Sequence, residues 1–322
     1  MKFGLAVGNL PITEMVEIAQ ALEKNEFNSV WIADHTPATN WRDPFITMAA
    51  ISQGTETIRI GCGVSNPYSR YAANIGVAAA TLAELCGDRI ILGMGAGGTL
   101  PLRPLEIEMW DRPVTAVRES IDMLRTLFQG DIVEYDGKIV RLKGVRIFDP
   151  VSIPLFVGTR GPVLSKLAGE MADGIIITPP FEAQLLCLEK VEEGLRKSKR
   201  SKIEVVDNVP MHISEDGNID AVKPVVALSI PTTPSYAIEL TESKALIRQI
   251  ADAMRTDRSK GAEMVTDDLV REFAIAGNSS QCIVQIESLE QHIDEICCLR
   301  FGTLSDILDT VKVLGKEIIP SF

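Results

Sequence analysis

The first half of the chain alternates short apolar runs with longer stretches in which apolar residues recur every three or four positions. A short apolar run bounded by turn residues is typical of a buried strand, and the longer pattern is typical of an amphipathic helix. Each strand and helix together span about 30 residues, which predicts repeated βα units and a parallel sheet. The predicted strands are Lys2–Val7, Ser29–Ala33, Ile58–Val64 and Arg89–Met94, and the predicted helices are Pro11–Lys24, Asp43–Gln53 and Ala72–Leu85.

The second half continues the pattern with four more strands and two irregular segments. Two short strand-like segments turn at Tyr135–Lys138, which predicts a β-hairpin before the fifth strand. Residues Gly217–Ile275 have a mostly helical pattern. The remaining predicted strands are Ile153–Val157, Ile175–Ile177, Glu204–Ile213 and Ile296–Phe301, and the remaining helices are Val114–Phe128, Pro162–Met171, Ser280–His292 and Leu304–Ile318.

Eight strands, most of them separated by predicted helices, fit an α/β fold. Periodicity alone allows either a (β/α)8 TIM barrel or a doubly wound open sheet. No segment has the proline, glycine or serine density of an interdomain linker. We therefore expect a single domain over residues 1–322, with insertions at about 131–150 and 215–268.

Composition and charge exclude several classes of protein. Hydrophobic residues make up 46% of the chain, enough for one large core, yet no run approaches the ~18 apolar residues of a membrane span. The first residues do not have a signal-peptide layout, so we expect a cytoplasmic protein. The net charge of −12 repels nucleic acid and anionic membranes. An anionic ligand therefore needs local donors.

The cysteines and histidines do not form a metal-binding pattern. The six cysteines lack C-x-x-C spacing, and we interpret them as reduced core residues. The three histidines are far apart in the sequence, so no metal site is expected. The residues are Cys62, Cys86, Cys187, Cys282, Cys297 and Cys298, and His35, His212 and His292.

Functional groups of a parallel barrel lie where the strands end. The second strand ends at Asp34 and His35, a pair that could serve chemistry or could cap the next loop. Glycines flank the end of the third strand, around Gly63, which indicates a bulge, a close approach to a ligand or a packing kink.

Two further strand ends are rich in glycine. Residues 93–98, after the fourth strand, hold four glycines that leave the backbone free to lie against a flat group or to present N–H groups to an anion. No acidic residue closes a following strand, so this is not a dinucleotide fingerprint. After the fifth strand, Gly158–Pro162 combines a hydroxyl, Arg160 and a helix start. It is either a phosphate site or an ordinary βα turn.

These strand ends together resemble the bacterial-luciferase-like superfamily, on the branch that uses the deazaflavin coenzyme F420. Within it the chain looks most like methylenetetrahydromethanopterin reductases, and next like F420-dependent sugar-phosphate and secondary-alcohol dehydrogenases. The resemblance is weak between Glu215 and Asp268, which we expect to form the wall that selects the substrate. It is densest in Trp31–His35, Gly61–Tyr68, Arg89–Gly95 and Gly158–Gly174, and it extends to Leu314–Ile319.

The resemblance implies a cofactor site at the carboxyl ends of the strands. A cis peptide between Gly63 and Val64 would back the deazaflavin ring, and Asp34 would face it. The remaining implied contacts are Ser65 and Asn66 along the cofactor side chain, backbone donors from Ala96 and Gly97, and Gly158, Thr159, Arg160 and Gly161 around the phosphate.

Two positions depart from the family. The reductases carry a glutamate where this chain has Ala6, and related enzymes carry an acid where it has Gly98. His35 and Asp34 are then the nearest candidates for proton transfer, since an imidazole titrates near neutral pH.

Three functions are compatible with these residues. The first is F420-dependent hydride transfer between the deazaflavin C5 and an electrophilic carbon of a small molecule, with a tetrahydropterin of archaeal one-carbon metabolism as one candidate. The second is an FMN-dependent monooxygenase, and the third is a homologue that binds the cofactor without catalysis. The family associates through barrel helices, and Ala72–Leu85 is rich in small residues, so we expect a homodimer or a higher homo-oligomer.

Overall fold

Eight parallel strands close into a barrel in the computed structural model, which describes residues 1–8, 10–37, 41–98, 102–107 and 112–322. The order around the barrel follows the chain, and a pairing between the sixth and seventh barrel strands closes the ring. The α/β (β/α)8 TIM barrel is thus confirmed, and the open sheet is excluded. The strands are β1 (Lys2–Val7), β2 (Ser29–Ile32), β3 (Arg59–Ser65), β4 (Ile90–Gly95), β7 (Leu155–Gly158), β8 (Gly174–Ile177), β9 (Glu204–Ile213) and β11 (Glu295–Leu299).

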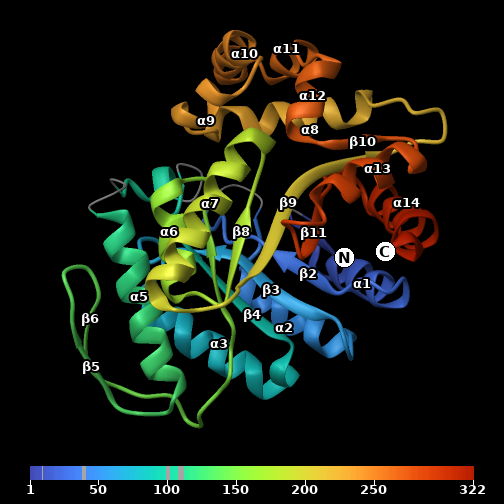
Figure 1. Ribbon diagram of the computed structural model, residues 1–322. Helices are drawn as coiled ribbons and strands as arrows, with labels where there is room; N and C mark the ends of the chain where they lie inside the picture. The colour runs from blue at the N-terminus through green and yellow to red at the C-terminus, as the bar shows by residue number, and fades with distance from the viewer. Residues whose placement is uncertain (9, 38–40, 99–101, 108–111) are drawn as a thin grey trace.

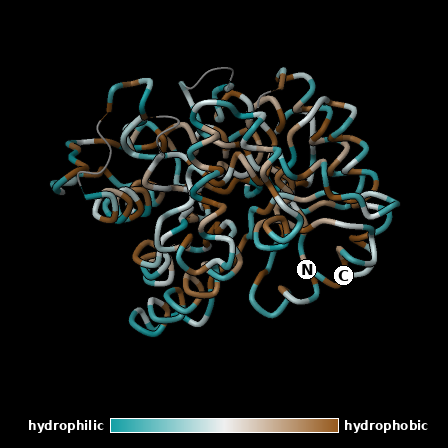
Figure 2. The backbone as a smooth tube through the Cα atoms, turned by 90° about the horizontal axis from the view of Figure 1, so that it is seen from above, coloured by the Kyte–Doolittle hydropathy of each residue, from teal (hydrophilic) through white to brown (hydrophobic). Residues whose placement is uncertain are grey.

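Helices cover the outside of the barrel, and hydrophobic segments gather at the centre of the molecule (Figure 2). Strand residues alternate between two buried clusters, as the pleat requires. Val30 and Ile32 belong to the cluster packed against the helices, whereas Trp31 belongs to the cluster inside the barrel. All six cysteines are buried. The barrel helices are α1 (Ile12–Lys24), α2 (Pro44–Gly54), α3 (Ala72–Cys86), α5 (Pro113–Phe128), α6 (Pro162–Met171), α7 (Phe181–Ser198), α13 (Ser279–Leu289) and α14 (Leu304–Val313).

The barrel interior is filled by one large side chain from each of six strands. Trp31 and Phe156 pack with their ring centroids 5.9 Å apart at the middle of this cluster. By the same alternation, residues two positions further along each strand face the carboxyl-terminal mouth of the barrel. The interior residues are Trp31, Ile91, Phe156, Ile176, Val206 and Cys297, with Ala6 and Val64 packed against them.

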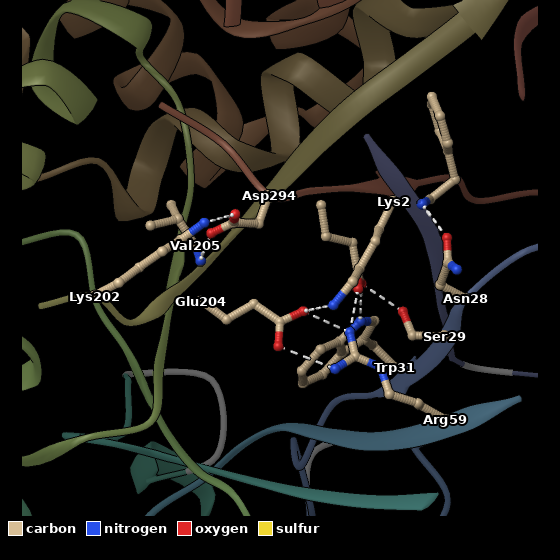
Figure 3. Close-up of polar contacts among 11 residues, drawn as sticks. Lys2, Asn28, Ser29, Trp31, Arg59, Lys202, Glu204, Val205 and Asp294 are labelled. Carbon is tan, nitrogen blue, oxygen red and sulfur yellow. Dashed lines mark hydrogen bonds and ion pairs between the residues drawn. The ribbon is translucent and has the colours of Figure 1, made fainter. Parts of the chain in front are cut away.

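A charged cluster joins the amino-terminal ends of the strands (Figure 3). The fully buried carboxylate of Glu295 accepts hydrogen bonds from Trp31 Nε1 at 2.8 Å, from Ser29 Oγ at 2.5 Å and from the Arg59 guanidinium at 2.7 Å. Arg59 also pairs with Glu204, which accepts from Lys2 Nζ at 2.9 Å. This cluster fills the amino-terminal end of the barrel, which leaves the opposite end for a ligand.

The predicted hairpin is present as β5 (Val133–Asp136) and β6 (Arg141–Val145), an antiparallel pair that lies outside α5 (Figure 1). The buried carboxylate of Glu119 on α5 accepts hydrogen bonds from three consecutive backbone N–H groups of the turn, at residues 138–140. Tyr135 of the hairpin also donates to Asp122 of α5 at 3.2 Å, so more than one side chain attaches the hairpin to the barrel.

The second insertion, residues 214–274, lies above the carboxyl-terminal end of the barrel (Figure 1). It is helical as predicted and has a hydrophobic core of its own, which Leu299 and Phe301 join to the barrel. Sequence analysis missed the three-residue strand β10 (Ile275–Gly277), which pairs with the end of β9. No helix of the described residues is long and apolar enough to cross a membrane. The helices of the insertion are α8 (Lys223–Ser229), α9 (Ser235–Leu240), α10 (Lys244–Thr256), α11 (Arg258–Glu263) and α12 (Asp267–Phe273).

Candidate active site

The end of β3 turns the side chain of Val64 into the barrel mouth. The register of β3 against β4 shifts between Cys62 and Ser65, and the peptide bond from Gly63 to Val64 is cis, so the predicted bulge and cis bond are both confirmed. Val64 is only half-buried and contacts the interior cluster on one side. The residue therefore offers a small apolar face to the mouth.

The glycines of β4 and β7 make room for Val64. A Cβ atom added to Gly95 would lie 2.7 Å from one Val64 methyl group, and one added to Gly158 would lie 2.5 Å from the other. Gly93 is equally restricted, because its Cβ would lie 2.3 Å from the carbonyl oxygen of Cys62. The glycine-rich pattern at these strand ends is thus explained by close packing around the bulge.

Trp31 supports the same bulge from below. A Cβ on Gly61 would lie 2.2 Å from the indole ring, and one on Gly63 would lie 3.1 Å from it. Because Glu295 fixes the indole Nε1, the charged cluster at the amino-terminal end holds the support of Val64 in place. We call Val64 and the residues packed around it, namely Trp31, Gly63, Gly93, Gly95 and Gly158, the Val64 platform.

Asp34 is buried in a network that joins the ends of β2 and β3. Its Oδ2 accepts hydrogen bonds from Ser65 Oγ at 2.7 Å and from Arg70 Nε at 2.9 Å, and its Oδ1 accepts from Thr36 Oγ1 at 2.5 Å. An arginine and two hydroxyl groups thus occupy both oxygens of the carboxylate. The geometry therefore favours a positioning role for Asp34 over proton transfer.

Ser65 and Asn66 use their side chains within the protein. The Ser65 hydroxyl donates to Asp34, and Asn66 Oδ1 accepts from the backbone N–H groups of Tyr68 and Ser69. Both residues are almost completely buried. Their backbone, rather than their side chains, is what these positions can offer to a cofactor. Ala96 and Gly97 follow β4 directly, and Gly97 has the left-handed φ of +74° that glycine tolerates best.

His35 lies at the end of β2 with its ring edge-on to Trp41, at 4.4 Å between ring centroids. Burial lowers the pKa of His35, and the nearby Asp34 carboxylate offsets this in part. Its Nδ1 is buried without a hydrogen-bond partner. The imidazole is therefore neutral near pH 7 and has a free nitrogen.

Several buried polar atoms at the mouth lack partners. Leaving such an atom unpaired costs about 1–3 kcal/mol, so a group of them indicates a ligand site. Three of the residues that carry such atoms, Thr178, Asn208 and Arg300, were not predicted as site residues from the sequence. The available signal was a polar residue at or just beyond the end of a buried apolar run. The described residues hold six such atoms, and four of them lie at the mouth. These are His35 Nδ1 after β2, Thr178 Oγ1 after β8, Arg300 Nε after β11, and Asn208 Oδ1 on the mouth side of β9.

The loop after β7 combines a helix start with a cation. Gly161 N donates to Thr159 Oγ1 at 2.9 Å, and α6 begins at Pro162 without a side-chain cap. Burial lowers the pKa of Arg160 to about 10, and no carboxylate of the described residues forms an ion pair with it. A half-buried guanidinium without a counter-charge, beside an uncapped helix N-terminus, is a suitable place for an anionic group.

The two positions that lack acids lie at the same mouth. Ala6 packs against the interior cluster, and a Cβ on Gly98 would meet no atom of the residues that the structure describes within 4 Å. The structure thus brings together all the residues that sequence analysis assigned to the site, on the ends of β2, β3, β4 and β7.

Comparisons with known proteins agree with this geometry. The family model described as luciferase-like monooxygenase matches residues 3–294. The 5,10-methylenetetrahydromethanopterin reductase of Archaeoglobus fulgidus is 29% identical over 99% of both chains, and an F420-dependent glucose-6-phosphate dehydrogenase of Nocardia farcinica is 28% identical over 85% of this chain and 83% of its own. The structure of the coenzyme F420-dependent tetrahydromethanopterin reductase of Methanopyrus kandleri superposes with a TM-score of 0.90 at 26% identity, covering 100% of this chain and 99% of its own.

Proposed function

The chain belongs to the luciferase-like monooxygenase family, and from this membership we propose that it is an oxidoreductase that uses coenzyme F420. The observation that carries the proposal is the Val64 platform, a small apolar face set among glycines at the barrel mouth. A flat tricyclic ring requires a support of this kind. We choose the deazaflavin of F420 over the flavin of FMN because the chain is similar over its full length to F420-dependent enzymes.

Residues of the mouth fit two parts of the cofactor, its ring and its phosphate. Val64 would support the ring, and the backbone of Ala96 and Gly97 would lie along it. Arg160, with Thr159 and Gly161 beside the start of α6, would hold the phosphate. When bound, F420 would supply the ring carbon C5 that accepts or gives a hydride.

Proton handling in this proposal belongs to His35. The neutral imidazole has an unpartnered Nδ1 at the mouth, where it can accept a hydrogen bond or a proton from a substrate group. Asp34 would orient the ends of β2 and β3 through Ser65 and Arg70. With alanine at position 6 and glycine at 98, His35 is our candidate for the proton-transferring side chain.

We further propose a small-molecule substrate with an electrophilic carbon, bound beside Thr178 and Asn208. A tetrahydropterin is the first candidate, because reductases acting on methylenetetrahydromethanopterin align with this chain from end to end. A place in archaeal one-carbon metabolism, a cytoplasmic location and a homodimer follow from the same likeness and stay predictions.

The proposal is tested by titrating the purified protein with F420 and with FMN, then screening hydride transfer to pterin, alcohol and sugar-phosphate substrates. We expect saturable binding of F420, weaker binding of FMN and turnover with one substrate class. Tight binding of FMN would favour the alternative, a flavin-dependent monooxygenase of the same family. Binding of F420 without turnover on any substrate would favour a non-catalytic homologue.

A further inference from the structure

Arg160 is held in place by residues of the insertion at 214–274. One guanidinium nitrogen, Nη1, donates to the carbonyl oxygen of Ser229 at 3.2 Å and to Thr232 Oγ1 at 2.9 Å. Both acceptors are neutral, so they orient the guanidinium without neutralising its charge. Ser229 is the last residue of α8, where the helix dipole also favours a cation.

The backbone of Arg160 is fixed by a second residue of the insertion. Tyr236, on α9, donates its hydroxyl hydrogen to the carbonyl oxygen of Arg160. The Tyr236 oxygen also lies 3.6 Å from Cys187 Sγ on α7. A small cavity lies between the end of β7, the first turns of α7, and α9. Arg160, Thr178 and Tyr236 all line it.

Buried residues flank the two anchoring residues in the sequence. Ile230 and Ala237, close to Thr232 and Tyr236 in the sequence, are each 1% exposed. Ile230 belongs to the separate hydrophobic core of the insertion. The position of the guanidinium is therefore set by the packing of the insertion as well as by the barrel.

We propose that Tyr236 and Thr232 are positioning residues that aim the Arg160 guanidinium at the anionic group of the bound cofactor. This inference rests on the proposed function, because it takes the phosphate of F420 as the anion. It assigns the insertion a second role beyond forming a wall of the substrate site. An insertion that selects the substrate would then also set the affinity for the cofactor phosphate.

The test measures binding of two ligands, F420 and the ribityl deazaflavin that lacks the phosphate and the tail attached to it. The dissociation constant of the ribityl deazaflavin divided by that of F420 reports the contribution of the phosphate and its tail, so a loss of structure that weakens both ligands equally does not change this ratio. We expect Tyr236→Phe and Thr232→Val each to lower this ratio about three- to tenfold, the effect of losing one neutral hydrogen bond, with the affinity for the ribityl deazaflavin unchanged.

Two matched variants serve as controls. Thr233→Val removes a neighbouring hydroxyl that also donates to Ser229 but does not contact Arg160. Tyr135→Phe removes a tyrosine hydroxyl from the hairpin, where it donates to Asp122. Both should keep the wild-type ratio. In an Arg160→Ala background, Thr232→Val should have no further effect on the ratio.

The outcomes separate this inference from the proposed function. A wild-type ratio in both Tyr236→Phe and Thr232→Val would overturn the inference, as would an equal loss of affinity for the two ligands. A wild-type protein that binds neither deazaflavin would overturn the proposed function, and the inference would fall with it. Thermal unfolding of each variant identifies any loss of affinity that comes from misfolding.

Discussion

Val64 is the residue on which the cofactor assignment depends most. Its methyl groups fill the space that Gly95 and Gly158 leave open, and its free side faces the mouth. Val64→Phe adds a ring that must extend into the mouth, since the glycine side is full. We expect F420 affinity to fall at least about tenfold, with a loss of about 1–3 kcal/mol in the free energy of unfolding.

The measurement is a fluorescence titration with F420 alongside urea unfolding. Val64→Ala is the control: it keeps the mouth open and should lower the affinity less than Val64→Phe. An unchanged F420 affinity in Val64→Phe would remove Val64 from the site.

A second residue gives a pH dependence. Asp207 on β9 is fully buried; its Oδ1 accepts from Gln184 Nε2 at 2.7 Å, while its Oδ2 has no partner. Burial raises its pKa to about 7, above the value of about 3.9 in an unfolded chain. Between these values the folded protein binds more protons, so stability falls as the pH rises through this window.

Asp207→Asn keeps the acceptor for Gln184 and removes the charge. We expect the free energy of unfolding of the variant, relative to that of wild type, to increase by about 2–4 kcal/mol between about pH 5 and about pH 8. The melting temperature of the variant relative to wild type should rise over the same range. Calorimetry at a series of pH values measures the difference. If the melting temperatures of the two proteins change with pH in parallel, the pKa of Asp207 is not raised in the folded protein.

At the level of residues, sequence analysis found those whose neighbours in the chain are distinctive. Val64 lies next to Gly63 at the end of β3, and Arg160 lies between Gly158 and Gly161. Tyr236 could not be assigned in this way, because its partner Arg160 lies 76 residues away in the sequence. A partner distant in the sequence leaves no local pattern.

Among the secondary structure elements, the hairpin offers the clearest test. The carboxylate of Glu119 accepts three backbone N–H groups of the β5–β6 turn at 2.8 to 2.9 Å, which lowers the pKa of Glu119. Glu119→Gln replaces one acceptor oxygen by an NH2 group that faces these donors. We expect faster amide hydrogen exchange at residues 138–140 and unchanged F420 affinity.

Glu134→Gln is the matched control, since Glu134 is an exposed glutamate of the same hairpin. It should leave the exchange rates as in wild type. If the amides of residues 138–140 exchange as slowly in Glu119→Gln as in wild type, the Glu119 carboxylate is not needed to hold the hairpin turn.

All eight barrel strands were predicted because each is an apolar run buried on both faces. The first residues of α2, α13 and α14, which follow the caps Asp43, Asn278 and Thr303, were predicted to within one residue. Strand β10 was missed because three residues contain no periodicity, and its pairing with β9 is made only in the folded chain.

For the whole molecule, the charged cluster at the amino-terminal ends links five strands, β1, β2, β3, β9 and β11. Glu295→Ala would leave the Ser29 hydroxyl and the Trp31 Nε1 without their acceptor and remove one carboxylate from Arg59. We expect a loss of about 3–5 kcal/mol in the free energy of unfolding, measured in urea.

Lys2→Ala provides the contrast, because the Lys2 ammonium is 45% exposed and its pairing with Glu204 is a surface ion pair. Its loss should cost less than about 1 kcal/mol. A similar cost for Lys2→Ala and Glu295→Ala would show that burial does not distinguish the two interactions.

The oligomeric state is a second property of the whole molecule that can be tested. α3 exposes Val77 and Leu85, and the adjacent α2 exposes Ile46; a second copy of the chain packed on these helices would cover such apolar side chains. We expect a homodimer in sedimentation at micromolar concentration and a monomer for Leu85→Glu. Val284→Glu, on α13, should stay dimeric. A wild-type monomer would contradict the expectation.

The central claim is that F420 binds at the barrel mouth, with its ring on Val64 and its phosphate at Arg160. The most direct measurement is a crystal structure of the protein grown with F420. We predict the ring against the Val64 side chain, the phosphate within hydrogen-bond distance of Arg160 and the start of α6, and an open face toward His35. A ring bound away from Val64, or a phosphate held by other residues, would contradict the account.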